Sequence, residues 1–460
     1  MMKKMSSSAF APAAFMAAFM AAVPAFATLT PSLPRGERTA QLPTLNGKTE
    51  ICVIPTHLPQ GLYSADDRAL ENDLCSMQPG QNVATCPKVY STNPGVDFYS
   101  IPAGMTAQSV EQNNNCEAGK KIAKYKLSVS CSYTPSIIGY YHLSRLLGGA
   151  GRVPVAVLRT LDIDRHKDIA NRALNIAAKT EGKDAIIYQT WSTVYSFLNK
   201  GKAFDKFKDM VFTDAIDQTY GASIRQVKER VLGDKDFYGE LFTKAAKGES
   251  RAAAFRDRNP VMAKVKSASP ASSLVSTSFS ASNVQALLQM KDVSDMILMD
   301  HIMSQQDRFG NLDYGLRFAY LENGEMKFAT QLSPQEVSSK RAVEVKAMLM
   351  RDNDCGVTKT NVARDEGLLS RVAHMDPVTY KNLLMLNRTA DSAEVTTAFK
   401  QGMMMTNIDW NGYKGRPGVR TLLNEAATTL QARCRSGQLK LDLDLGTHFS
   451  GRQAQQNCEI

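Results

Sequence analysis

The C-terminal half of the sequence contains a definite order of secondary-structure elements. Apolar residues recur at helical spacing over 284–303, and the polar loop 305–311 follows. Alternating apolar residues on both sides of Asn323-Gly324 predict a β-hairpin. A further apolar strand, 343–350, runs into the acidic loop 352–354. The pattern therefore predicts a helix, a polar loop, a hairpin and a buried strand that ends in two carboxylates.

The first 27 residues have the three parts of a secretory signal peptide. Two lysines precede the uncharged apolar stretch Ala9–Phe26, which ends in the small-x-small cleavage site Ala25-Phe26-Ala27. A membrane anchor is disfavoured because it requires about 20 well-packed apolar residues, whereas this stretch is rich in alanine and interrupted by prolines. We therefore expect a secreted or periplasmic protein that begins near Thr28 and has no membrane span.

The eight cysteines all follow the expected signal peptide. An even number of cysteines in an oxidising compartment predicts disulfides. Five lie between Cys52 and Cys131, so we expect this part to be held by disulfides, and Cys434 with Cys458 could tie down the C-terminal tail. Zinc is disfavoured because no C-x-x-C pair occurs. Cys355 has no accompanying base, so we expect a disulfide there rather than a nucleophile.

Composition and periodicity divide the rest of the chain. The net charge is +10, and the basic residues are scattered along the chain rather than clustered in one run. Net charge alone therefore does not identify a partner. We expect no nucleic-acid partner. A strand is predicted over 122–129, with Lys124 and Lys126 on its polar side, and a helix over 136–147. The expected segments are a disulfide-rich extension at 28–95, a β-containing part at 96–160, a mostly helical part at 161–283 and a further part at 284–460.

Phosphoryl transfer requires few side chains, because catalysis depends mainly on positioning and charge neutralisation. It needs a carboxylate beside the attacking hydroxyl, a carboxamide and a second carboxylate that hold magnesium, and a lysine that clamps the nucleotide. The polar loop, the acidic loop and the lysine strand can supply these groups. The candidate residues are Asp307, Asn311, Asp352, Asp354, Lys124 and Lys126.

Three short blocks of sequence occur in an order found in one group of kinases. The block 141–148, with Arg152-Val153-Pro154 after it, resembles the helix-then-Val-Pro segment of the atypical secretory-pathway kinases, the Golgi casein kinase and xylosylkinase group. Asp300-His301-Ile302 leading to Asp307-Arg308 is similar to the catalytic loop of that group and, more distantly, to HipA-type and phosphoinositide kinases. Asp352-Asn353 resembles the Asp-Asn-Gly that replaces Asp-Phe-Gly in several members.

The resemblance covers less than a third of the chain and implies a two-lobed α+β protein-kinase-like fold. The N-lobe at 96–160 would be small and contain β-strands, and the C-lobe would be mostly helical. The resemblance further implies a kinase that transfers phosphate from ATP, with Mg or Mn, to a protein or glycan hydroxyl. In that group's terms, Asp307 would be the base, Asn311, Asp352 and Asp354 the metal ligands, and Lys126 or Lys124 the phosphate clamp.

The sequence also departs from this group. The metal-binding residue should lie five positions after the catalytic aspartate, where Leu312 stands, and Asn311 lies four positions after it. The helix position expected to carry a glutamate for the lysine is Ile137, so Glu111 or Glu117 would have to replace it. No clear glycine-rich loop is present. A catalytically inactive kinase-fold protein, acting as a secreted binding protein, scaffold or effector, is therefore the alternative.

Each signal also has a plain structural explanation. Asp307 and Arg308 could form an ordinary ion pair at a helix end, which contributes little at a surface. Asp-Asn-Asp suits a simple turn, and a strand lysine is usually solvated. However, two carboxylates that close a buried strand repel each other unless a cation lies between them. This last consideration favours a functional site.

Overall fold

The computed structural model describes residues 36–459 except for 90, 92, 114, 130, 200–211, 214–217, 226–244, 310–311 and 359. All of these residues belong to one structural unit, Pro34–Ile460. The expected signal peptide and the candidate ligand Asn311 lie outside the described residues.

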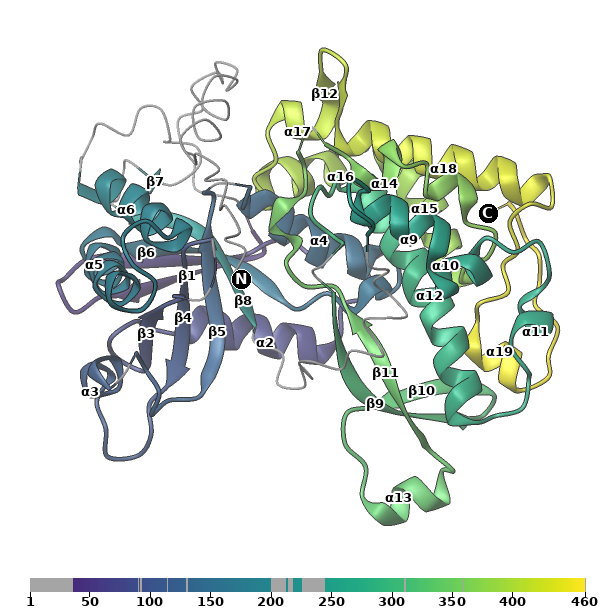
Figure 1. The fold of residues 1–460 in the computed structure, drawn as a ribbon, viewed down its shortest axis with the longest axis horizontal. Helices are drawn as coiled ribbons and strands as arrows, with labels where there is room; N and C mark the ends of the chain where they lie inside the picture. The colour runs from purple at the N-terminus through teal and green to yellow at the C-terminus, as the bar shows by residue number, and fades with distance from the viewer. Residues whose placement is uncertain are drawn as a thin grey trace, which may run out of the picture. The chain divides into compact units, whose positions relative to one another are not determined.

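A single antiparallel sheet forms the centre of the N-terminal part (Figure 1). The strand order is β1-β2-β6-β8-β5-β4-β3, and β7 pairs with β8. The predicted lysine strand, β5, therefore lies inside the sheet, between β4 and β8. The strands are β1 (Arg38–Pro43), β2 (Thr49–Ile54), β3 (Val83–Pro87), β4 (Gly95–Ser100), β5 (Lys121–Leu127), β6 (Ala156–Asp162), β7 (Phe212–Thr213) and β8 (Gln218–Arg225).

This sheet is larger than the sequence indicated. The segment 28–95, expected as a disulfide-rich extension, contributes β1, β2 and β3, and β8 comes from the segment expected to be mostly helical. Glycine weakens the strand signal of β8. Gly221 is nevertheless required there, because a side chain would collide with the backbone carbonyl of Lys126 on the neighbouring strand.

The helices of the N-terminal part are α2 (Ala65–Ser76), α3 (Ala107–Gln112), α4 (Thr134–Leu146), α5 (Ile163–Thr180) and α6 (Ile186–Asn199). Helix α4 confirms the helix predicted over 136–147 and is buried along most of its length. It packs between the sheet strands β6 and β8 and the C-terminal helices. Gly148 and Gly149 follow with φ angles of 81° and 86°, which end the helix as expected.

The C-terminal part is mainly helical and contains a second, three-stranded sheet. The long helix α12 (Ala281–Ile302), the hairpin β9 (Asp313–Glu322) and β10 (Glu325–Ala329), and strand β11 (Val343–Leu349) occur in the predicted order. Asn323 and Gly324 both have positive φ, as a two-residue hairpin turn requires. The α+β class, with a sheet-rich N-terminal part and a mainly helical C-terminal part, is confirmed.

Shorter elements complete the C-terminal part. Among the described residues, no helix combines the length and apolar character needed to cross a bilayer. The remaining elements are α9 (Arg251–Arg258), α10 (Pro260–Val265), α11 (Ala271–Leu274), α13 (Pro334–Ser339), η3 (Asn353–Cys355), α14 (Val362–Asp365), η4 (Leu369–Arg371), α15 (Pro377–Thr389), α16 (Ala393–Thr397), η5 (Ala398–Gly402), α17 (Asn407–Asn411), β12 (Gly412–Tyr413), β13 (Arg416–Pro417), α18 (Val419–Arg435) and α19 (Leu445–Phe449), with η1 (Ala150–Arg152) in the N-terminal part.

All eight cysteines are paired, which confirms the expected disulfides and fits a chain that folds in an oxidising compartment. Cys434–Cys458 ties the tail to α18 as expected. Cys355 is half of a disulfide, and its partner is Cys131. This bridge joins the segment after the lysine strand β5 to the acidic loop after β11. The other pairs are Cys52–Cys75 and Cys86–Cys116.

Candidate functional site

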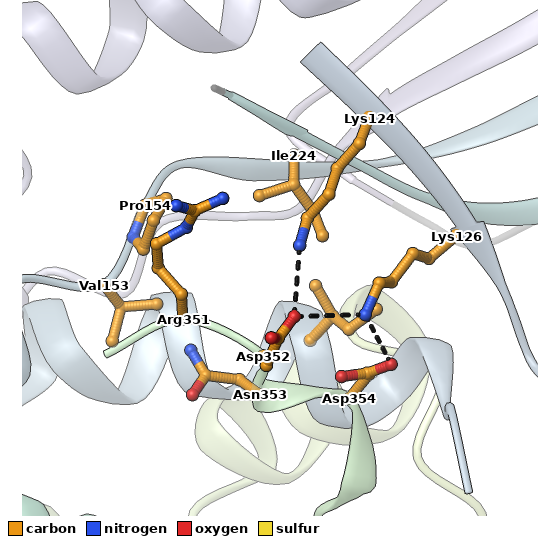
Figure 2. Close-up of a pocket in the computed structure, with 10 residues that line it drawn as sticks. Lys124, Lys126, Val153, Pro154, Ile224, Arg351, Asp352, Asn353 and Asp354 are labelled. Carbon is orange, nitrogen blue, oxygen red and sulfur yellow. Dashed lines mark hydrogen bonds and ion pairs between the residues drawn. The ribbon is translucent and has the colours of Figure 1, made fainter. Parts of the chain in front are cut away.

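Two lysines of β5 point to the same side of the sheet. Lys124 and Lys126 are two residues apart, and alternate residues of a strand share a face. Their side chains are only 7% and 4% exposed. Both ammonium groups point toward the acidic loop that follows β11 (Figure 2). The expectation that strand lysines are usually solvated therefore does not hold here.

The ammonium group of Lys126 lies between two carboxylates. Its Nζ is 2.7 Å from Asp354 Oδ2 and 3.3 Å from Asp352 Oδ1, and Lys124 Nζ is 3.4 Å from the same Asp352 oxygen. The Asp354 side chain is 3% exposed, whereas that of Asp352 is 41% exposed. The cation expected between the two acidic side chains is thus supplied by Lys126, and Asp352 remains open to the solvent.

The acidic loop has an unusual backbone that is held from several sides. Asp352 has φ 49° and ψ 47°, the left-handed region that Asp and Asn tolerate better than most residues. The N–H of Tyr133 donates to the carbonyl of Asp354 at 2.8 Å, and Ser136 Oγ donates to that of Asn353 at 2.6 Å. Together with the Cys131–Cys355 bridge, these bonds attach the loop to the start of α4.

The charges in the pocket shift one another's pKa values. Lys124 and then Lys126 hold the pKa of Asp352 well below its usual range, against an opposing effect of burial. For Asp354, burial acts to raise the pKa, but Lys126 outweighs it and the pKa is lowered. Burial likewise acts against the charged form of Lys126, but Asp354 and Asp352 raise its pKa. At neutral pH these three groups are ionised.

Lys124 behaves differently from its neighbour. Burial lowers the pKa of Lys124 to about 7, and the positive charge of Lys126 acts in the same direction. Asp352 opposes this shift but does not overcome it. A second buried ammonium group with insufficient negative charge around it favours the binding of an anion, because an anion would stabilise its protonated form.

The polar loop after α12 is bonded to the acidic loop through Arg308. The guanidinium of Arg308 is buried and donates to Asp300 on α12, at 2.8 and 3.0 Å. It also donates to the carbonyl of Arg351 at 2.8 Å and to Asn353 Oδ1 at 2.7 Å. Tyr140 of α4 donates to Asp300 at 2.7 Å. Arg308 is therefore a buried link between the two loops and not part of a surface ion pair.

Asp307 lies next to this link. Its side chain is exposed, and its N–H donates to Gln305 Oε1 at 3.1 Å. The neighbouring N–H of Gln306 donates to the carbonyl of Cys355 at 3.2 Å. The residues on either side of Asp307, Gln306 and Arg308, thus both bond to the acidic loop. Asp307 itself is not among the described residues that line the pocket.

The glutamates suggested as lysine partners do not fill that role. Ile137, the helix position that lacks the glutamate, does face the pocket. Glu111 instead accepts hydrogen bonds from Thr85 and Arg165, and Glu117 is exposed. The sequence could not identify the partners of Lys126, because they come from the acidic loop more than 220 residues later.

The pocket combines these charges with an apolar wall. Val153 and Pro154, from the Val-Pro block, line it, and so does Arg351, which sequence reasoning missed. Arg351 Nη1 lies 3.1 Å from Asp313 Oδ2, so its charge has a partner on β9. The described lining residues are Lys124, Lys126, Ile137, Val153, Pro154, Ile224, Arg351, Asp352, Asn353 and Asp354.

The chemistry of these side chains fits a hard divalent cation. Carboxylate oxygens are the ligands that Mg²⁺ prefers, and Mg²⁺ is usually held by one or two carboxylates together with substrate phosphates. The described residues contain no group of three or more His, Cys, Asp or Glu side chains that could hold a metal ion by themselves. Phosphate oxygens or water would therefore complete the coordination at Asp352 and Asp354.

Comparison with known proteins finds similarity at the level of solved structures. No family model matches the sequence, and no curated protein matches it. A Golgi casein kinase structure is 14% identical, with a TM-score of 0.36, over 84% of this chain and 76% of that chain. A structure of the Golgi casein kinase with Mn/ADP bound is 13% identical, with a TM-score of 0.34, over the same shares of the two chains.

A hydra Fam20 structure with sugar is 12% identical, with a TM-score of 0.39, over 82% of this chain and 91% of that chain. Structures of the Golgi casein kinase group, which the sequence blocks resemble, are thus among those similar to this chain.

Proposed function

We propose that this chain is an exported phosphotransferase that uses ATP with Mg or Mn and transfers phosphate to a protein or glycan hydroxyl. One observation carries the proposal. Two buried lysines of β5 and two aspartates of the loop after β11 converge in one pocket, although more than 220 residues separate them. Polyphosphate binding with a metal needs this combination of ammonium groups and carboxylates.

Each described residue of the site has a role that its environment suits. Lys126, which stays charged at neutral pH, would bind a phosphate oxygen, and Lys124 would gain its proton beside the same anion. Asp352 and Asp354 would hold the divalent cation, and Asn311, outside the described residues, is proposed as a further ligand from the sequence alone. The metal would neutralise charge on the transferred phosphoryl group. Asp307, exposed beside the buried Arg308 link, would orient and deprotonate the acceptor hydroxyl.

Two substitutions test these roles because they should fail differently. Asp307→Ala should lower phosphate transfer by a factor on the order of 10² or more, because the general base is lost, and should leave nucleotide binding largely intact. Asp352→Ala should weaken both, because the cation loses a ligand. Phosphate incorporation into a panel of hydroxyl-bearing peptides and oligosaccharides, together with the nucleotide-induced thermal shift, separates the two outcomes. Undiminished nucleotide shifts in both variants would refute the metal role of Asp352.

The alternative is a kinase-fold binding protein without catalysis. Two observations favour it: Ile137 faces the pocket where a glutamate was expected, and Asp307 does not line the pocket. This alternative predicts no thermal shift with ATP at any concentration of Mg or Mn. It also predicts that Asp307→Ala and Asp352→Ala change partner binding only as far as they change stability.

A further inference from the structure

We propose that Lys88, directly after β3, is a third phosphate-binding lysine of this pocket, in a phosphate subsite that it forms with Asn93, just before β4. This inference rests on the proposed nucleotide-dependent function and extends it. The sequence contains no clear glycine-rich loop over the phosphates, and Lys88 is not among the candidate residues that it indicates. Strand β4, which follows the connection from β3, pairs directly with the lysine strand β5.

The strand register places Lys88 beside Lys126. The N–H of Lys88 donates to the carbonyl of Gly95 at 2.9 Å, and Gly95 is the residue opposite Lys126 in the β4–β5 pair. A Cβ atom added at Gly95 would lie 3.9 Å from Lys88 Cδ and 3.8 Å from Lys126 Cγ. The two lysine side chains therefore pass the same bare glycine, on the same face of the sheet.

The far end of the same connection also reaches the acidic loop. Asn93 Nδ2 donates to Asp354 Oδ2 at 3.2 Å, which is the oxygen that accepts from Lys126. The connection thus contributes Lys88 near its start and Asn93 near its end. Asn93 thus contacts a carboxylate that lines the pocket, and Lys88 lies beside the pocket-lining Lys126 across Gly95.

The balance of charge indicates what Lys88 would bind. Lys124 and Lys126 contact the carboxylates of Asp352 and Asp354, and Lys88 is close enough for Lys126 and Asp352 to influence its pKa. The three lysines thus outnumber the two carboxylates. Lys88 forms no ion pair with a carboxylate in the described part of the chain, and burial, followed by Lys126, lowers its pKa. A divalent cation at the carboxylates would add to the positive surplus. A nucleoside triphosphate has enough negative charge to balance it, and its terminal phosphates are the part that would reach Lys88.

The test compares nucleotides that differ only in their phosphates. In calorimetric titrations with Mg²⁺, Lys88→Met should weaken ATP binding about 10- to 100-fold, the effect of losing a charge-assisted hydrogen bond. AMP binding should change less than about twofold. Lys88→Arg should retain most of the ATP affinity. Lys120→Met is the matched control, because Lys120 is exposed just before β5, and it should leave both affinities unchanged.

A second measurement uses the unaltered protein and does not depend on the folding of a variant. Mg·ATP should protect Lys88 from an amine-acetylating reagent, read by peptide mass spectrometry, while Lys120 stays reactive. If wild-type protein binds Mg·ATP but Lys88 is not protected, or Lys88→Met loses ATP and AMP affinity equally, the subsite is refuted and the proposed function stands. If wild-type protein binds no Mg·ATP, both are refuted.

Discussion

Binding of Mg·ATP should draw one proton from solution onto Lys124. In the free protein, burial and the neighbouring Lys126 lower the pKa of Lys124 to about 7. The negative charge of a phosphate group between the two lysines would stabilise the protonated form of Lys124. It would thereby return the pKa of Lys124 toward its ordinary value of about 10.4. At pH 8 only about one tenth of the Lys124 side chains are protonated before binding, so the complex should take up about 0.9 proton.

The same shift determines how affinity and stability depend on pH. Between pH 7 and the higher pKa of the complex, ATP affinity should fall by up to about tenfold per pH unit, because deprotonated Lys124 must first regain its proton. In the free protein the pKa of Lys124 is lower than in the unfolded chain. The unfolded state therefore binds more protons between about pH 7 and pH 10, and the contribution of Lys124 to stability rises over that range and is lost as the pH falls through 7.

Calorimetry in buffers with different heats of ionisation measures the uptake directly. Titrations of Mg·ATP at pH 8 in Tris and in HEPES should give enthalpies whose difference corresponds to about 0.9 proton. Lys124→Met should abolish this difference, whereas Lys120→Met should preserve it. Uptake below about 0.2 proton in the wild type, or equal uptake in the wild type and Lys124→Met, would refute the placement of phosphate beside Lys124.

Three further predictions concern the buried link, the disulfides and the expected signal peptide. Arg308→Met should lower the free energy of unfolding by about 3–5 kcal/mol, because it leaves the buried Asp300 carboxylate unpaired; a urea midpoint like that of the wild type would contradict this. Replacing Cys131 and Cys355 with serine should weaken Mg·ATP binding and lower stability. The matched protein with Cys434→Ser and Cys458→Ser should lose stability only. Equal nucleotide affinities in the two proteins would argue against a role of the Cys131–Cys355 bridge in nucleotide binding. Exported protein should have its N-terminus within a few residues of Thr28, and an intact mass that retains the first residues would show the opposite.

Local patterns in the sequence predicted the parts of the site. The alternation along β5 indicated that Lys124 and Lys126 share one face, and the strand predicted over 343–350 indicated where Asp352 and Asp354 follow it. The order of helix, hairpin and strand from residue 284 onward was predicted for the same reason. In each case the residues that decide the conformation are close neighbours in the chain, so their spacing is visible without a structure.

The tertiary structure alone decided which of these parts meet. Glu111 is a plausible partner for a lysine by sequence, yet folding places it against Thr85 and Arg165. Strand β8 lies in the centre of the sheet although Gly221 weakens its strand signal. The glycine is needed there because β5 approaches so closely that a side chain would not fit. Such outcomes depend on contacts between segments that are far apart in the sequence, and the periodicity within one segment does not reveal them.

The sequence by itself determined that this chain carries lysines on one face of a strand, carboxylates after another, and an even set of cysteines for an oxidising compartment. Only the tertiary structure placed the ammonium group of Lys126 between Asp352 and Asp354, with Cys131–Cys355 beside them. The reason is physical: a buried charge is stable only where an opposite charge packs against it. That partner is selected by the packing of the whole sheet and the acidic loop rather than by neighbours in the chain.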